Sequence, residues 1–271
     1  MGAAVAVAAC AGLCVAAGSA AAATVTRVVS RAGTVQFVYR AGRGELNRLT
    51  VSGQVTQEPE FASFAFRGSP RPRPLGGCTR GPGPTTSTCQ ATGAQFGGFD
   101  GTRIFLGDRN DVATASQSQV FGEAGNDRLT ARFGAPLDGG TGNDVLVGDG
   151  TDNTLTGGLG SDRLYGGAGR DVALYAARRA AIRVDLRRAG PDGARGERDF
   201  LFGVENVRTG RGPDFLVGNA VANTFTAGAG NDTVNVVGGG PDIVFCGPGF
   251  DTVRADSTDT LVGCERVTRA G

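Results

Sequence analysis

The sequence predicts an all-β fold, a β-solenoid of nonapeptide repeats with a small N-terminal β-rich cap. The main observation is a run of four consecutive nine-residue units in the middle of the chain. These units are Gly139–Val147, Gly148–Thr156, Gly157–Tyr165 and Gly166–Leu174. The first six residues of each unit are mostly glycine, small residues and Asp or Asn, and the eighth residue is apolar. A fixed period of this kind indicates stacked coils in which each unit contacts only its neighbours.

Each unit predicts one turn and one short strand. The glycine-rich segment favours a tight turn, and the last three residues favour a minimal strand with one inward side chain. The inward residues are Leu146, Leu155, Leu164 and Ala173, which stacking aligns into an apolar ladder. If each coil has two turns, residues eighteen apart lie on the same side. This pairs the sixth-position residue Asp144 with Asp162, and Asn153 with Asp171.

The stacked sixth-position carboxylates predict a metal ion. They would repel one another unless a cation lay between them, and oxygen ligands on a turn rich in carbonyl groups suit Ca²⁺. The chain contains no histidine, which excludes imidazole sites, and its cysteines are too scattered for a zinc cluster. Ca²⁺ is therefore the expected cofactor.

Two units, GGTGNDVLV and GGLGSDRLY, match the pattern G-G-x-G-x-D-x-U-x. The chain therefore resembles the hemolysin-type (RTX) calcium-binding repeat proteins. Arg43-Gly44-Glu45-Leu46-Asn47 further resembles an element of actinobacterial, secreted members. The resemblance implies a parallel β-roll that holds Ca²⁺ between same-side turns. A flexible glycine-rich linker is the alternative, but a linker has no reason to place an apolar residue every nine positions.

The resemblance also implies a set of metal ligands, which are sixth-position side chains and carbonyl groups of turn glycines. These are Asp127, Gly139, Gly140, Asp144, Asn153, Gly157, Asp162, Gly166, Asp171, Asp214, Asn223, Asp232, Asp242 and Asp251. Asp127 and Asp144 are seventeen residues apart, which predicts a slip within Arg132–Asp138. Asp214 and Asp232 are eighteen apart, whereas Asp232 and Asp251 are nineteen apart and are expected to pair more loosely.

The composition along the chain divides it into five segments. They are a signal peptide (1–23), an N-terminal β-rich cap region (24–96), a first repeat block (97–174), an insert (175–209), and a second repeat block with a C-terminal cap (210–271). The insert resembles a segment common between RTX blocks, and we interpret it as a spacer that continues the roll. A functional cleft formed by its arginines and carboxylates is the alternative.

The ends and the cysteines predict an exported protein. The first 23 residues carry no charge, are mostly Ala, Val, Leu, Gly and Cys, and end in Ala21-Ala22-Ala23, as in a secretory signal peptide. A membrane anchor is the competing interpretation. Four cysteines remain outside this segment, which favours the disulfides Cys78–Cys89 and Cys246–Cys264 in an oxidising compartment. Free thiols are the alternative for a cytoplasmic protein.

The function predicted from these observations is a secreted, calcium-binding β-roll with a structural or binding role outside the cell. No Ser–His or Cys–His relay and no catalytic lysine is available, since the chain has neither His nor Lys, so we expect no enzyme activity. A small carbohydrate-acting enzyme with a pair of carboxylates is the alternative. A net charge of +1 gives no basic stripe for nucleic acid. The expected partners are calcium ions and a cell-surface or polysaccharide ligand, with no membrane span in the mature chain. The alternative is a calcium-independent solenoid adhesin or cell-wall-binding module, in which Arg128, Arg163 and Arg170 neutralise the aspartates.

Overall fold

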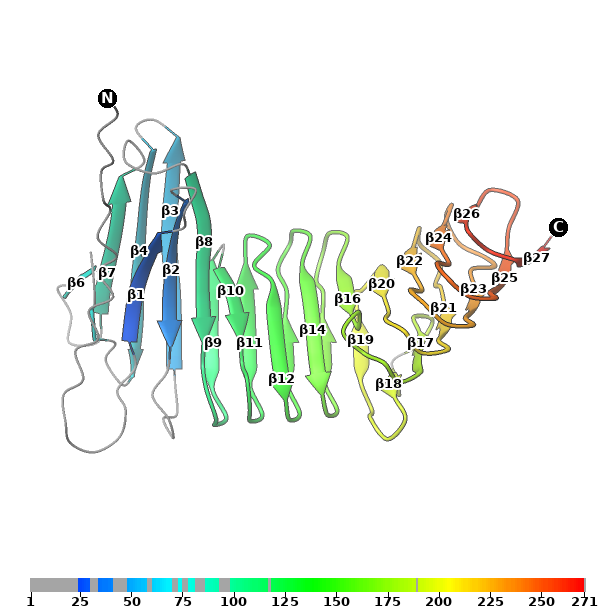
Figure 1. Ribbon diagram of the computed structural model, residues 1–271, viewed down its shortest axis with the longest axis horizontal. Helices are drawn as coiled ribbons and strands as arrows, with labels where there is room; N and C mark the ends of the chain where they lie inside the picture. Colours follow the sequence, from blue (N-terminus) through cyan, green and yellow to red (C-terminus); the bar gives the residue numbers. More distant parts are fainter. Residues whose placement is uncertain are drawn as a thin grey trace, which may run out of the picture.

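The computed structural model describes residues 24–29, 34–40, 48–57, 60–69, 73–74, 78–80, 86–92, 98–116, 118–188 and 190–270. Side chains are described at 38–40, 103–116, 118–188 and 190–270. The predicted signal peptide and the element at 43–47 lie outside the described residues. Within them the chain forms strands and turns and contains no helix. The fold is an all-β, parallel β-solenoid, as the repeat period predicts (Figure 1).

The described strands form three sheets. Sheet A has the order β5 (Arg73–Pro74), β1 (Thr24–Val29), β2 (Thr34–Arg40), β8 (Gly98–Phe105), β10 (Ser118–Phe121), β12 (Leu137–Thr141), β14 (Thr154–Leu159), β16 (Val172–Leu174), β20 (Asn206–Arg208), β22 (Thr224–Thr226), β24 (Ile243–Phe245) and β26 (Thr260–Val262). Sheet B has the order β6 (Cys78–Arg80), β7 (Thr86–Thr92), β4 (Glu60–Ser69), β3 (Arg48–Gln57), β9 (Val112–Ser116), β11 (Arg128–Arg132), β13 (Val145–Val147), β15 (Arg163–Tyr165) and β19 (Phe200–Phe202). Sheet C has the order β18 (Gly193–Ala194), β17 (Ile182–Asp185), β21 (Phe215–Val217), β23 (Thr233–Asn235), β25 (Thr252–Ala255) and β27 (Arg266–Arg269).

The repeat strands pair in parallel, and the register stacks the apolar residues as predicted. In sheet B, Leu146 lies opposite Leu164, and in sheet A, Leu137 lies opposite Leu155, which lies opposite Ala173. All five side chains are 0–1% exposed. Full burial of one leucine contributes about 1.5–3 kcal/mol, so the core is a thin ladder whose strength grows with the number of coils.

The N-terminal strands extend the solenoid with antiparallel pairs. β1 pairs with β2, and β3 pairs with β4, while β2 and β3 join the first coil through parallel pairing to β8 and β9. These strands cover one end of the stack, opposite the C-terminus (Figure 1). An open solenoid end would expose apolar residues and unpaired strand edges, so this arrangement closes one end of the core.

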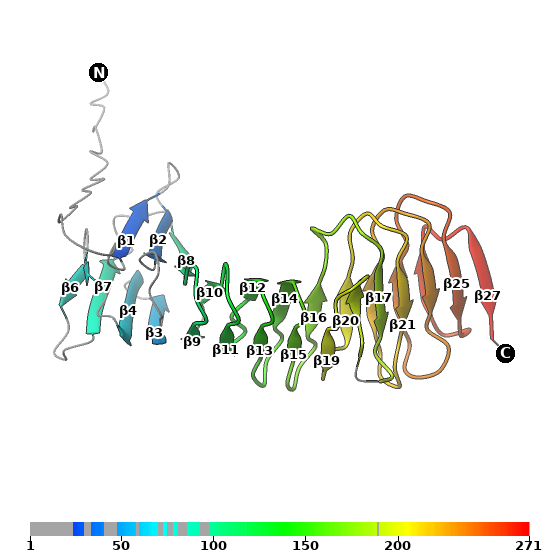
Figure 2. The same cartoon turned by 90° about the horizontal axis from the view of Figure 1, so that it is seen from below.

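The insert continues the stack but changes its cross-section. Its strands join all three sheets: β19 ends sheet B, β20 continues sheet A, and β17 with β18 begins sheet C. β17 and β18 are antiparallel, unlike the strands of the repeats. Figure 2 shows that the stack is taller from β16 onward, where sheet C replaces sheet B.

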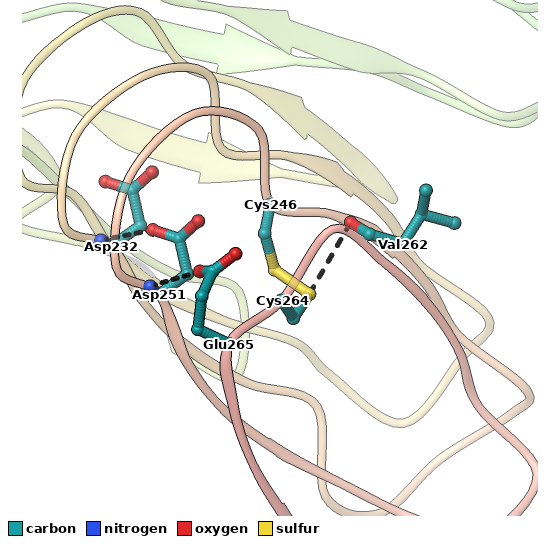
Figure 3. Close-up of a disulfide and its surroundings, with 6 residues drawn as sticks. All are labelled: Asp232, Cys246, Asp251, Val262, Cys264 and Glu265. Atoms are coloured by element: carbon teal, nitrogen blue, oxygen red, sulfur yellow. Dashed lines mark hydrogen bonds between the residues drawn. A yellow bond between two sulfur atoms is a disulfide. The ribbon is translucent and has the colours of Figure 1, made fainter.

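One disulfide joins the last two coils. Cys246 and Cys264 are bonded, and their Cα atoms are 5.3 Å apart across a sequence separation of 18 residues (Figure 3). This confirms the predicted C-terminal bridge. For the other predicted bridge, the β6–β7 register places Cys78 opposite Cys89. The side chains of that pair lie outside what the structure describes.

Candidate metal centre

Three columns of polar side chains follow the turns, and each member directly precedes a strand. The first column, on turns into sheet B, consists of Asp111, Asp127, Asp144, Asp162 and Asp199. The second column, on turns into sheet A, consists of Asn153, Asp171, Glu205, Asn223, Asp242 and Asp259. The third column, on turns from sheet A to sheet C, consists of Asp214, Asp232, Asp251 and Glu265.

One hydrogen bond repeats along the columns and connects consecutive coils. The backbone N–H of Asp144 donates to Oδ1 of Asp162 at 2.8 Å, and the N–H of Asp127 donates to Oδ1 of Asp144 at 2.7 Å. The N–H of Asn153 donates to Oδ1 of Asp171 at 2.7 Å. The structure therefore stacks these side chains in the order that the spacing predicts, and a carboxylate of one coil satisfies an amide of the coil before it.

The two irregular spacings do not loosen the columns. The slip predicted between Asp127 and Asp144 contains Phe133 and Gly134, both with positive φ (58° and 72°). The expectation of a looser Asp232–Asp251 pair is wrong: the N–H of Asp232 lies 2.8 Å from Oδ1 of Asp251. The extra residue is accommodated between β23 and β24, so the turn itself keeps its register (Figure 3).

The second carboxylate oxygen of most column members is buried without a hydrogen-bond partner. These oxygens are Oδ2 of Asp127, Asp144, Asp162, Asp171, Asp214, Asp232, Asp242 and Asp251. A buried carboxylate oxygen without a partner costs several kcal/mol, far more if it is ionised. Each such position therefore requires a cation or a proton.

The first block places a turn carbonyl beside the unpartnered oxygens of Asp127 and Asp144. A Cβ atom added at Gly139 would lie 2.3 Å from Oδ2 of Asp144 and 2.6 Å from the carbonyl oxygen of Gly157. At Gly122 the corresponding neighbours are Oδ2 of Asp127, at 2.2 Å, and the carbonyl oxygen of Gly139, at 2.4 Å. Only glycine fits at these first positions, because two oxygens from consecutive coils occupy the space that a Cβ atom would need.

The second column repeats this arrangement in the first block. A Cβ atom at Gly148 would lie 2.0 Å from the carbonyl oxygen of Gly166 and 2.4 Å from Oδ1 of Asn153. The predicted ligands Gly139, Gly157 and Gly166 thus each direct a carbonyl group toward the sixth-position side chain of the preceding coil. A donor set of carboxylate and carbonyl oxygens on a glycine-rich turn fits Ca²⁺.

The turns of the third column that carry Asp214, Asp232 and Asp251 differ at their first position. Thr209, Ala227 and Cys246 stand where the first block has glycine, and all three are buried. The Thr209 hydroxyl donates to the carbonyl oxygen of Ala227 at 2.7 Å, and it opposes the rise that burial causes in the pKa of Asp214. A protein hydroxyl therefore shares the space next to the Asp214 carboxylate.

Burial raises the pKa of the carboxyl groups of Asp127, Asp144 and Asp162 in the first column. Desolvation is the largest cause at each site, and the backbone N–H groups that donate to the carboxylates oppose it. The pKa of Asp144 and of Asp162 rises to about 7, and that of Asp127 to about 6. Without a metal ion these groups therefore hold protons at pH values at which the unfolded chain is ionised.

We expect the metal-free protein to lose stability as the pH rises from about 4 to about 7. In this window the folded state binds more protons than the unfolded state, because the folded pKa values lie above the ordinary value of 3.8. Far-UV circular dichroism in chelator across this pH range measures this, since the β signal of the metal-free protein should be strongest at about pH 4 and fall toward pH 7. A β signal that increases with pH over the same window would contradict the expectation.

Carboxylates alone do not make the metal centre. Among the described residues, no group of three or more His, Cys, Asp or Glu side chains is arranged to hold a metal ion. The coordination shell of the metal ion would therefore depend on turn carbonyl groups.

The described part of the chain has no helix that is long and apolar enough to cross a membrane.

The arginines do not take the role that the calcium-independent alternative gave them. In the described part of the chain, ion pairs join Arg178 to Glu197 and join Arg187 and Arg188 to Asp185. None joins an arginine to a member of the three columns. The guanidinium of Arg163 instead lies 5.7 Å from the ring centroid of Phe200. Side chains next to the sixth position point away from the columns because the strand alternates its faces.

Among the column members that are not in the predicted ligand set, Asp199 and Glu205 lie in the insert, outside the period of nine. Oδ1 of Asp199 accepts the N–H of Asp162 at 2.9 Å, and Oε2 of Glu205 accepts the N–H of Asp171 at 2.9 Å. These pairs are separated by 37 and 34 residues, so the period of nine gives no sign of them. A signal was present in the sequences DFLF and ENVR, which keep an acid two positions before an inward apolar residue but lack the glycine turn.

The sequence matches the family model described as "RTX calcium-binding nonapeptide repeat (4 copies)" over residues 96–135, 138–173 and 208–240. The chain carries RTX calcium-binding repeats. No curated protein matches the chain. The matched RTX segments contain most of the first block and the start of the second, including Asp144, Asp162 and Asp232, but not Asp199, Asp242 or Asp251. RTX repeats typically bind Ca²⁺, so the columns and their unpartnered oxygens have a chemical explanation.

Proposed function

We propose that the protein is a secreted calcium-binding β-roll with a structural or binding role outside the cell, and not an enzyme. The observation that supports this most directly is the pairing of a buried, unpartnered carboxylate oxygen with a turn carbonyl of the next coil, as at Asp144 and Gly157. In the first block the ligands would be Asp127, Asp144, Asn153 and Asp171 with the carbonyl groups of Gly139, Gly157 and Gly166. This proposal includes that the protein is of the actinobacterial, secreted type that its sequence resembles.

Calcium would order the repeats after export. The thin core offsets little of the conformational entropy of a chain with 47 glycines. Turn-based sites of this kind have dissociation constants of about 10⁻⁴–10⁻³ M in extracellular modules. Folding would then depend on metal, since the ion binds a site that the unfolded chain lacks.

Far-UV circular dichroism with Ca²⁺ titrated into chelator-treated protein tests the proposal. We expect a transition from coil to β signal at about millimolar Ca²⁺ and much less response to Mg²⁺, which demands a smaller octahedral shell. Isothermal titration calorimetry of the same samples gives the number of ions bound. A full β signal in chelator and no heat of binding would contradict the proposal and favour the calcium-independent adhesin or cell-wall-binding module.

The same proposal includes a second binding partner in addition to calcium. A roll of this length presents long, regular sheet faces, which suit an extended ligand such as a cell-surface polysaccharide. We assign no nucleic acid as partner, because the formal net charge is only +1.

A further inference from the structure

The insert contains one turn that has no carboxylate. This turn, residues 175–181, follows β16 and lies between the last turn of the first column and the first turn of the third column. The backbone N–H of Arg211, in the turn that carries Asp214, donates to the carbonyl oxygen of Arg178 at 3.0 Å. At its other side the guanidinium of Arg178 donates to the carbonyl oxygen of Gly158 at 2.6 Å. The turn thus contacts both columns and supplies its own positive charge.

The first position of this turn is Tyr175 rather than glycine. Its side chain is buried, and its hydroxyl donates to Oδ2 of Asp199 at 2.9 Å. Asp199 is therefore a member of the first column whose second oxygen has a protein donor, while Oδ2 of Asp127 and of Asp144 has none. The Tyr175 hydroxyl thus gives Oδ2 of Asp199 the partner that a cation would give to the corresponding oxygens of the repeats.

The surroundings of the Asp162 carboxylate also differ from those of the other first-column sites. A Cβ atom added at Gly157 would have as its three nearest neighbours only atoms of Asp162, at 2.4, 3.0 and 3.0 Å. A carbonyl oxygen of the next coil is not among these three, whereas the carbonyl oxygen of Gly157 is the second-nearest neighbour of a Cβ atom at Gly139, beside Asp144. The guanidinium of Arg178 lies against the repeat unit that carries Asp162, since it donates to the carbonyl oxygen of Gly158 at 2.6 Å.

Arg178 is held in this place by its own network. Its guanidinium pairs with Oε1 of Glu197, and both side chains are only 14% exposed. Oε2 of Glu197 accepts the N–H of Ala194 at 2.9 Å. Asp192 and Asp199 exchange two backbone hydrogen bonds of 2.9 and 3.0 Å beside this pair. A buried, charge-assisted pair with fixed geometry keeps its contacts without a metal ion.

We propose that Tyr175 and Arg178 close the coil of the insert without a metal ion where the first column gives way to the third, so that the calcium sites of these two columns lie on either side of a metal-free junction. This inference rests on the proposed function, since it presupposes that the repeats bind calcium. The junction stays ordered when calcium is removed and gives both blocks a folded neighbour on which to assemble when calcium returns.

Hydrogen exchange of the full chain, resolved to single amides, tests this. In chelator we expect the amides of Asp162, Asp199 and Arg211 to be protected about 100-fold more than those of Asp144 and Asp232. Arg178→Met should reduce the protection of the first three amides by about tenfold to a hundredfold, the range expected for a hydrogen bond to a charged group. Arg179→Met, at the exposed neighbouring arginine, should leave it unchanged and serves as the matched control.

The other outcomes separate the two proposals. If the insert exchanges as fast as the repeats in chelator, or if Arg178→Met behaves like Arg179→Met, the metal-free junction is overturned while calcium-dependent folding stands. If all amides are as strongly protected in chelator as they are with calcium, calcium-dependent folding itself is overturned. Should Arg178→Met fail to fold even with calcium, Tyr175→Phe removes only the hydroxyl and should lower protection at Asp162 and Asp199. No change in that variant would also overturn the junction.

Discussion

Replacing Gly142 by alanine is expected to prevent the first repeat block from folding, even with calcium present. Gly142 has a φ of 130°, and a Cβ atom there would lie 1.7 Å from the carbonyl oxygen of Gly125 in the preceding coil. An alanine is strained in this conformation, and the contact can be relieved only by separating two coils. We expect a loss of more than about 4 kcal/mol, since a forced contact between packed coils at a strained backbone position is among the most destabilising changes that a single substitution causes. Urea unfolding in saturating Ca²⁺ measures the effect.

The control for this substitution is Gly150→Ala. A Cβ atom added at Gly150 meets nothing within 4 Å. We expect its free energy of unfolding to stay within about 0.5 kcal/mol of the original chain. Equal stability of the two variants would show that the turns are not stacked as closely as the structure has them.

Asp144→Asn is expected to remove one calcium ion from the first block. Asparagine keeps an Oδ1 atom that accepts the N–H of Asp127, so the column hydrogen bond survives. The negative charge next to the carbonyl group of Gly157 is lost, and a neutral ligand binds Ca²⁺ more weakly. Calorimetry should show one ion fewer, and the midpoint of the calcium-induced β signal should rise by about tenfold.

Asp152→Asn is the matched control for the loss of charge. Asp152 is exposed, and its Oδ1 accepts the N–H of Arg170 at 2.8 Å, a bond that asparagine also keeps. Both variants therefore remove one carboxylate charge and preserve one interturn hydrogen bond. An unchanged number of bound ions in Asp144→Asn, or an equal loss in Asp152→Asn, would count against the assignment of Asp144 as a ligand.

Where the period of nine is unbroken, the sequence was enough to predict the fold and the order of the columns. Leu146 and Leu164, or Asp144 and Asp162, are related by eighteen residues in the sequence and are neighbours in the structure. A solenoid makes this possible because each coil contacts only the coils beside it, so that stacking follows from spacing. The C-terminal disulfide follows the same rule, since Cys246 and Cys264 are eighteen residues apart.

The spacing in the sequence does not predict which residues of the insert are neighbours, and only the tertiary structure decided this. It placed Asp199 and Glu205 in the columns across gaps of 37 and 34 residues. It also brought Tyr175 into contact with Asp199, and Arg178 into contact with Gly158. It also ended sheet B and began sheet C. The physical reason is that a segment without a period has no fixed rise per residue along the solenoid. The three-dimensional course of the backbone determines which side chains of the insert become neighbours. In the repeats, the spacing in the sequence already determines this.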